Sequence, residues 1–274
     1  MVSNAILVRL LGITLGVLWV VLLSFGLPIS TGDSGFSWHA FLIATEDPMY
    51  PINMQVLMWV AFFFCLSEVV IKWLGQIEQR RWMEAFSLYS NPHSVTVYTP
   101  KGEAQVELDA NEALKPELLA AIFYAKRKQL HPRALITSFF KKINHQFQST
   151  NDVGDVYSAV TNDIDMKLHQ VDLGYTVIRY LVWLIPTLGF IGTVIGIALA
   201  LGQAAVLGSA DPEMLEQVIP MLATAFYTTL LALLLSAVLM ILIQIVQAKD
   251  EQLVNTIGTF CMDEIVTNLK PSST

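Results

Sequence analysis

The stretch LGFIGTVIGIALALGQA, from Leu188 to Ala204, decides the class of fold. Its length approaches the roughly 20 residues that a helix needs to cross a bilayer. At 100° per residue, its small and polar members fall within about 80° of one another. These members are Gly189, Thr193, Gly196, Ala200 and Gln203. A helix that served only as a lipid anchor would not need such a face.

A second stretch, ATAFYTTLLALLLS from Ala223 to Ser236, follows the same design. Small and hydroxyl residues recur in it at every fourth position, and large apolar side chains occupy the other face. The recurring residues are Thr224, Thr228, Ala232 and Ser236, with Ala225 and Thr229 alongside. The sequence therefore predicts two membrane helices, each with one narrow polar face.

The composition is that of an integral membrane protein: 54% of the residues are hydrophobic, 14% are charged, and the mean hydropathy is +0.54. Four apolar runs are long enough to span a bilayer, at about 5–27, 53–74, 181–203 and 219–246. The net charge of −7, with no basic stripe longer than Lys126–Lys128, argues against nucleic acid as a partner. Five scattered histidines, two separate cysteines and the lack of a phosphate-binding loop argue against an enzyme or a metal site.

The distribution of basic residues predicts the orientation. None of the 16 Lys and Arg residues lies in the two loops at 28–52 and 204–218. Because cytoplasmic loops collect positive charge, we expect both termini in the cytoplasm and these two acidic loops outside. The protein is then a multi-pass membrane protein. One alternative is that the first run is a cleaved secretory signal, which would leave the topology beyond residue 50 unchanged.

The segment between the second and third runs predicts a mainly helical cytoplasmic domain. We divide the chain into residues 1–74 (two spans), 75–180 (cytoplasmic domain), 181–246 (two spans) and 247–274 (a cytoplasmic C-terminal helix or tail). Alternation of apolar and polar residues on both sides of Pro100–Glu103 predicts a small β-hairpin at 93–109. Apolar positions three and four apart from Val153 to Ile178 predict one long helix that continues into the third span. Four carboxylates are placed on its outer face: Asp155, Asp163, Asp165 and Asp172.

The two polar-faced stretches together resemble a family of proton channels that includes the flagellar stator protein MotA and the envelope proteins TolQ and ExbB. The resemblance is carried by LGFIGTVIG at Leu188–Gly196, by ATAF at Ala223–Phe226, and by a proline before each, Pro186 and Pro220. It covers the last two spans; the first 180 residues fit only in the layout of apolar runs. Tyr227 departs from the pattern, because TolQ-like and ExbB-like sequences usually have glycine there.

The resemblance implies an all-α homo-oligomer, a pentamer, whose third and fourth spans line a central space. In that space the family holds single-span helices of a B-type partner of the MotB, TolR or ExbD kind. A membrane Asp of the partner binds the ion, and the threonines that correspond to Thr193 and Thr224 face it. The last two spans of this chain contain no Asp, Glu, His, Lys or Arg. A partner is therefore needed to supply a group that titrates near neutral pH.

We thus expect an ion-conducting subunit of a motive-force-driven motor, with no cofactor, that translocates H⁺ or Na⁺. The expected ion path contains Gly189, Thr193, Gly196, Ala200, Gln203, Thr224, Tyr227, Thr228 and Ser236. A weaker expectation places a cytoplasmic docking face at Arg80, Arg81, Lys126, Arg127 and Lys128. The process that would be driven, whether motility, outer-membrane import, envelope maintenance or defence, is left open.

Two structural alternatives stand beside this interpretation. The small residues and threonines can serve helix packing alone, as in Gly192-x-x-x-Gly196, in an oligomeric scaffold or a passive channel. Glu68 and Lys72, one turn apart at the inner end of the second span, are expected to form an ion pair with each other, with contact to an ion or a lipid as the alternative.

Overall fold

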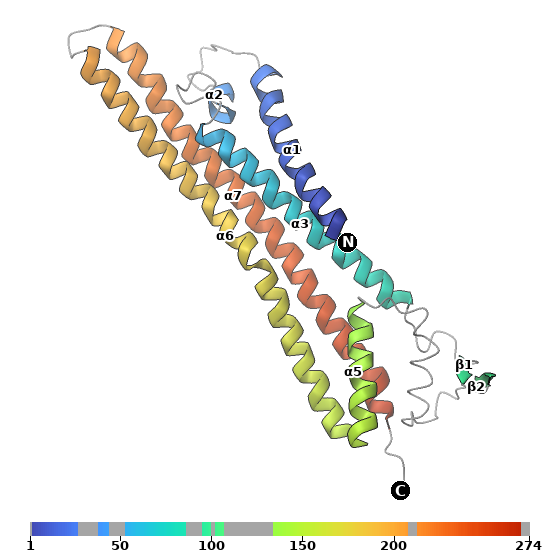
Figure 1. The fold of residues 1–274 in the computed structure, drawn as a ribbon. Coiled ribbons are helices and arrows are strands. Elements are labelled where there is room, and N and C mark those ends of the chain that lie inside the picture. Colours follow the sequence, from blue (N-terminus) through green and yellow to red (C-terminus); the bar gives the residue numbers. More distant parts are fainter. Residues whose placement is uncertain are drawn as a thin grey trace. The chain divides into compact units, whose positions relative to one another are not determined.

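The computed structural model of the protein describes residues 2–26, 38–43, 53–85, 95–99, 102–106, 134–207 and 213–269. Its helices are α1 (Val2–Gly26), α2 (Trp38–Leu42), α3 (Met54–Ala85), α5 (Leu135–Thr150), α6 (Val153–Leu207) and α7 (Glu213–Phe260), followed by a π-helical turn (Cys261–Ile265) and a 3₁₀ turn (Val266–Asn268) (Figure 1). Two short strands, β1 (Val95–Thr99) and β2 (Gly102–Val106), complete the described elements. The structure is thus mainly helical.

Four of the described helices are long and apolar enough to cross a membrane. They are α1, α3, α6 and α7, and each covers all or nearly all of one of the four apolar runs of the sequence. The prediction of a multi-pass membrane protein is therefore confirmed. The orientation of the spans stays a prediction.

Helix α6 is continuous from Val153 to Leu207, which confirms the single long helix predicted from the apolar spacing. Pro186 lies inside α6, and Pro220 lies inside α7. A proline in a helix interior removes one backbone hydrogen bond, a cost that membrane helices tolerate when neighbouring groups satisfy the freed carbonyl.

The chain divides into two compact units, one made of residues 1–72 and 175–246 and the other of residues 73–174 and 247–274. In the first unit, α1 packs on α3 through glycine. A Cβ added at Gly12 would lie 2.6 Å from the Cβ of Ser67, and one at Gly16 would lie 3.2 Å from the Cβ of Phe63. Trp19 and Trp59 then meet edge to face, with ring centroids 5.8 Å apart.

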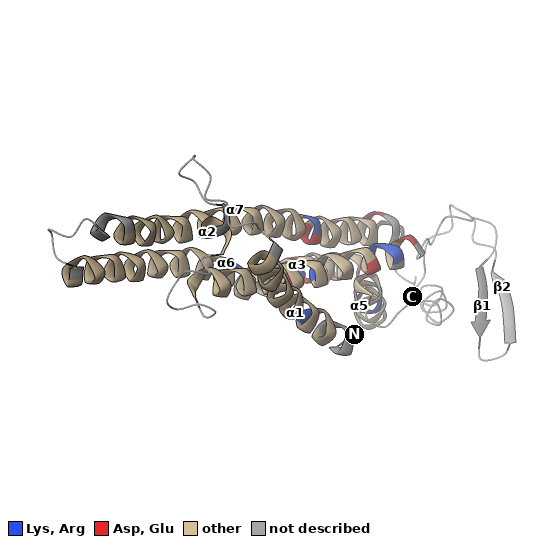
Figure 2. Ribbon diagram, turned by 90° about the horizontal axis from the view of Figure 1, so that it is seen from above, with Lys and Arg blue, Asp and Glu red and all other residues tan. Residues whose placement is uncertain are grey.

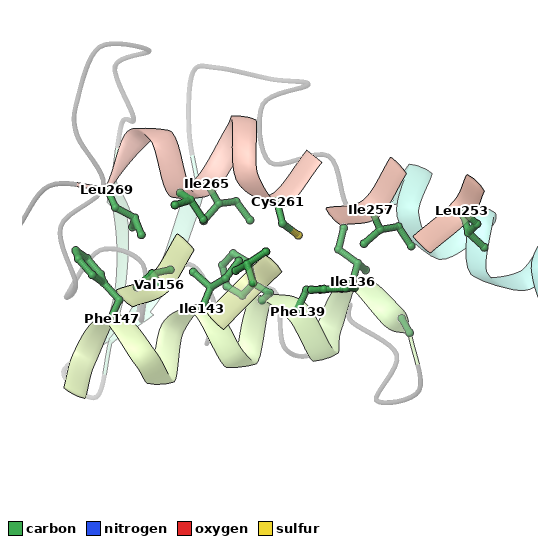
Figure 3. Packing of buried hydrophobic residues seen from close by; sticks show 14 residues of the cluster. Ile136, Phe139, Ile143, Phe147, Val156, Leu253, Ile257, Cys261, Ile265 and Leu269 are labelled. Carbon is green, nitrogen blue, oxygen red and sulfur yellow. The ribbon is translucent and has the colours of Figure 1, made fainter. Parts of the chain in front are cut away.

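The second unit has a core of large apolar side chains. Ile136, Phe139, Ile143 and Phe147 recur at three- and four-residue intervals on α5 and are fully buried. They pack against Val156 and Val160 at the start of α6 and against the C-terminal part of α7 with the turns that follow it, as far as Leu269 (Figure 3). The backbone N–H of Leu135 donates to Oε1 of Gln79, 2.9 Å away, and this bond ties the start of α5 to α3.

One predicted surface residue belongs to this core. Asp163 was placed with the exposed carboxylates of the long helix, but it is only 7% exposed and accepts a hydrogen bond from Nζ of Lys142 on α5 at 2.8 Å. Asp155, Asp165 and Asp172 are exposed, as expected. The prediction for Asp163 was wrong because α5 packs on that side of α6, a neighbour that the periodicity of α6 alone does not reveal.

Within the predicted hairpin segment at 93–109, β1 and β2 pair antiparallel, with Val95 opposite Val106 and Thr99 opposite Gly102. The turn residues Pro100 and Lys101 lie outside the described residues. The role of this segment stays open.

Candidate functional site

A close contact between α6 and α7 in the first unit is built from glycine and alanine. A Cβ added at Gly189 would lie 2.4 Å from the Cβ of Ala232, and one at Gly196 would lie 2.6 Å from the Cβ of Ala225. At Gly192, an added Cβ would lie 2.9 Å from Oγ1 of Thr228. Larger side chains would push the helices apart, so these small residues fix the distance between the two backbones. We call this contact the α6–α7 interface.

Three threonine hydroxyls lie in the α6–α7 interface, and we call Thr193, Thr228 and Thr229 the hydroxyl cluster. Oγ1 of Thr193 contacts Oγ1 of Thr229 and lies 3.1 Å from the carbonyl oxygen of Gly189 and 3.2 Å from that of Ala225. Oγ1 of Thr229 lies 3.2 Å from the same Gly189 oxygen. Thr228 donates to the Ala225 oxygen at 2.7 Å. Each hydroxyl therefore has an acceptor within the chain.

The hydroxyl cluster links the two helices because its threonines share two carbonyl oxygens, that of Gly189 on α6 and that of Ala225 on α7. Gly189 and Ala225 lie one turn before the threonines and lack bulky side chains, so their oxygens are accessible to a hydroxyl of the facing helix. Thr193 accordingly lies within reach of a carbonyl of its own helix and of one of α7. Such hydroxyl bonds across membrane helices contribute about 0.6 kcal/mol each on average.

The structure brings together only some of the residues predicted for the ion path. Gly189, Thr193, Gly196 and Thr228 meet in the α6–α7 interface. Thr228 is 5% exposed and Ala200 is fully buried. Thr224 is half-buried. Whether any of them lines a path for ions stays a prediction.

The side chains of the remaining predicted residues make their contacts outside the hydroxyl cluster. The side-chain amide of Gln203 donates to Oε1 of Gln217 at 2.8 Å. This bond links α6 to α7 at a different level from the threonines, because Gln203 is ten residues after Thr193 and Gln217 is eleven residues before Thr228. Ser236 donates to the carbonyl of Leu233 in its own helix at 3.0 Å. Tyr227 packs its ring edge to face on Phe41 of α2, with centroids 6.1 Å apart.

Thr229 was the member of the cluster that the predicted ion path omitted. On a helical wheel it stands about 100° away from Thr228, beside the main stripe. Its spacing of four from Ala225 was visible in the sequence. The facing residue, Thr193, could not be read from the periodicity of either helix, because periodicity does not state how two helices are rotated against each other.

The two helices carry no charged side chain near the hydroxyl cluster. In α6 the last charged residue is Arg179, and in α7 none occurs between Glu216 and Lys249. The long tan stretches of both helices in Figure 2 correspond to these segments. Among the described residues, no three His, Cys, Asp or Glu side chains come together to hold a metal ion. The cluster can thus offer hydroxyl and carbonyl oxygens to a cation, while it has no group that titrates near neutral pH.

Charged groups occur instead between α1 and α3. Arg9 binds Glu68 through two nitrogens, Nε at 2.5 Å and Nη2 at 3.2 Å. The expected pair of Glu68 with Lys72 was therefore wrong in its partner. Nζ of Lys72 lies 4.9 Å above the ring of Tyr175 on α6, a cation–π geometry. The planar guanidinium can bind both carboxylate oxygens at once, which the single ammonium of Lys72 cannot do.

Of the predicted docking residues, Arg80 and Arg81 lie on α3 and are exposed. Lys126, Arg127 and Lys128 lie outside the described residues. A docking role for these basic residues stays a prediction.

A comparison with known protein families found one match. Residues 131–259 match the model of the MotA/TolQ/ExbB proton channel family. This match confirms the predicted resemblance in the last two spans and extends it to α5 and the N-terminal part of α6. The match covers just under half of the chain. No curated protein and no solved structure matches the chain. The matched family is one of proton channels and not of enzymes.

Proposed function

We propose that this chain, whose residues 131–259 match that proton channel family, is an ion-conducting subunit of a motor driven by an ion gradient across a bacterial inner membrane. Five copies would surround the single-span helices of a B-type partner. A membrane Asp of the partner would bind H⁺ or Na⁺, and no further cofactor would be needed. The second unit would lie in the cytoplasm and α1 would remain attached.

The observation that carries this proposal is a polar cluster inside a pair of helices that have no charged group nearby. Thr193, Thr228 and Thr229 supply oxygens that a hydrated or partly dehydrated ion can contact. They cannot hold and release a proton by themselves, because a threonine hydroxyl does not titrate in the physiological range. A carboxylate from another chain would complete the path.

The exposed side chains of α6 and α7 support an assembly of several copies. Large apolar side chains are exposed on both helices of the single chain: Phe190 (67%), Val194 (52%), Phe226 (62%) and Leu230 (45%). In an oligomer such faces are available for lipid, for neighbouring copies and for the helices of a partner. The pentamer itself comes from the family and is part of the proposal.

One observation favours a second candidate function, an oligomeric scaffold or passive channel. Every hydroxyl of the cluster already has an acceptor in its own chain. Glycine and alanine bring the two helices together at the same level. Packing alone would produce the same arrangement. The two functions differ in whether the hydroxyls are needed for ion flow.

The test uses the full-length chain, co-expressed with the product of a neighbouring reading frame that encodes one N-terminal span with an Asp. The purified assembly is reconstituted in liposomes, and a pH-sensitive dye inside them reports proton entry under an imposed gradient, with a sodium gradient as the parallel arm. We expect ion entry that depends on the partner's Asp. An assembly that binds no single-span protein and has lipid in its centre would exclude the motor.

The variants Thr193→Val and Thr193→Ser separate ion flow from packing. Valine keeps the branched shape and removes the oxygen, whereas serine keeps the oxygen. We expect the valine variant to assemble but to lose at least about tenfold in ion entry, the effect of about 1.4 kcal/mol on a rate, and the serine variant to retain most of it. Thr14→Val on α1 is the matched control, because that hydroxyl bonds only within its own helix, to Leu11. Unchanged flux in Thr193→Val would favour the scaffold.

A further inference from the structure

The short helix α2 lies in the segment between the first two spans, close to the start of α3 (Figure 1). Its C-terminal carbonyls are bound by two side chains of α3. Nε2 of Gln55 lies 2.9 Å from the oxygen of Ala40 and 3.2 Å from that of Phe41, and Nε1 of Trp59 lies 2.9 Å from the oxygen of Leu42. Gln55 is 1% exposed and Trp59 is 7% exposed.

These bonds fasten a helix that is too short to be stable alone. Five residues are far below the length at which an isolated helix persists in water. The last carbonyls of any helix lack partners within it, and here buried donors of a neighbouring helix satisfy three of them. Buried polar side chains are costly when unpaired, so Gln55 and Trp59 hold α2 in one place on α3.

The apolar side of α2 is in contact with α7. Phe41 is 6% exposed, and Ile43, which directly follows α2, is fully buried. The ring of Phe41 meets that of Tyr227 edge to face at 6.1 Å, with an angle of 87° between the planes. Tyr227 directly precedes Thr228 and Thr229. The first residue of α3 reaches the same region, since a Cβ added at Gly192 would lie 3.2 Å from the Cβ of Met54.

From these contacts we infer that α2 is a positioning element for the hydroxyl cluster. The chain of contacts runs from Gln55 and Trp59 through α2 to Phe41, and from Phe41 to Tyr227. It holds the turn of α7 that carries Thr228 and Thr229 against α6. Phe41 and Tyr227 act through the threonines and are positioning residues. The consequence for ion flow rests on the proposed function, whereas the positioning of α7 does not.

The test measures hydrogen–deuterium exchange in the full-length protein in lipid nanodiscs. Phe41→Ala removes the ring that contacts Tyr227. We expect backbone exchange in residues 221–232 to become about two- to tenfold faster, the range that corresponds to the loss of one aromatic pair. Exchange in α5, which belongs to the second unit, should stay unchanged. Phe25→Ala is the matched control, because Phe25 is 88% exposed on α1.

A double-substitution cycle sharpens the result. Tyr227→Ala should accelerate exchange in 221–232 as Phe41→Ala does, and the double variant should exchange no faster than the faster single variant, because both remove the same contact. Additive effects would overturn the inference. So would unchanged exchange in 221–232 with Phe41→Ala, or an equal acceleration in α5 that indicates general destabilisation.

The exchange result is independent of ion flow. If the chain conducts no ions with any single-span partner, the proposed function fails and the exchange data still decide whether α2 positions α7. If the wild-type assembly conducts ions, Phe41→Ala should lower the rate of ion entry while the partner still co-purifies. A flux equal to that of wild type would overturn the role of α2 in positioning the cluster.

Discussion

Helices α6 and α7 pack against each other in both units, and they do so by two different means. In the first unit the contact consists of glycine, alanine and threonine, with hydrogen bonds between hydroxyls and carbonyls. In the second unit, large side chains such as Ile257 and Val160 pack together with those of α5, and Ile164 of α6 packs on Gly258 of α7. The same two helices thus change their packing chemistry along their length.

The proposed topology, with the second unit in water and the first in the membrane, explains the difference. In water, the burial of large apolar side chains drives association, so a third helix rich in phenylalanine and isoleucine would stabilise the second unit. Lipid tails are as apolar as leucine, so burial of leucine against another helix contributes little in a membrane. Close van der Waals contact between backbones and a few hydrogen bonds take its place, and both require small residues.

The largest expected effect lies in the second unit. Phe139→Ala removes a fully buried ring from the core and should lower the free energy of unfolding of that unit by about 3–5 kcal/mol. Chemical denaturation, monitored by hydrogen–deuterium exchange in α5, measures this free energy of unfolding. Tyr157→Ala, at a side chain that is 55% exposed on α6, is the control. Similar losses for the two variants would show that this core is not the stabilising element.

The second effect tests the small-residue contact in the first unit. Gly189→Ala places a Cβ against Ala232, where only 2.4 Å is available, and should destabilise the helix pair by about 1–3 kcal/mol. Gly202→Ala on the same helix has open space around it. That variant should be neutral or gain up to about 1 kcal/mol from helix propensity. Thermal unfolding in detergent compares them, and a tolerated Gly189→Ala would contradict the close contact.

The third effect concerns the ion pair of the second unit. Oδ2 of Asp163 has no partner among the described residues, and Lys142→Met also removes the hydrogen bond to Oδ1, which leaves the carboxylate buried and unpaired. We expect a loss of about 1–2 kcal/mol, less than for a fully buried pair because the Lys142 side chain is 40% exposed. Adding Asp163→Asn should restore most of the stability, as measured by urea denaturation. No recovery in the double variant would show that Lys142 acts through its alkyl chain.

The smallest effect is that of a single hydroxyl in the first unit. Thr229→Val should cost only about 0.6 kcal/mol, the average for a hydrogen bond between membrane helices. A double-mutant cycle with Thr193→Val should give a coupling energy of similar size. The same cycle with Ser236→Ala should give none, because that serine bonds within its own helix. Equal couplings would mean that Thr193 and Thr229 do not interact specifically.

Much of the fold was predictable because its signals are local. Runs of about 20 apolar residues require spans, and spacings of three and four predicted α6 as one helix. The family resemblance of the last two spans was predictable from motifs such as Leu188–Gly196, whereas its extension back to residue 131 was not. The faces of the helices were also predictable from the 100° rotation per residue, and this is how Thr193 and Thr228 were found.

The sequence by itself determined which residues share a helix face, since that follows from backbone geometry. Only the tertiary structure decided what each face meets: Thr229 for Thr193, Arg9 for Glu68, and α5 for Asp163. The physical reason is that a partner depends on the rotation and distance between helices. Those are set by the sum of many weak contacts across the molecule, and no single segment encodes them.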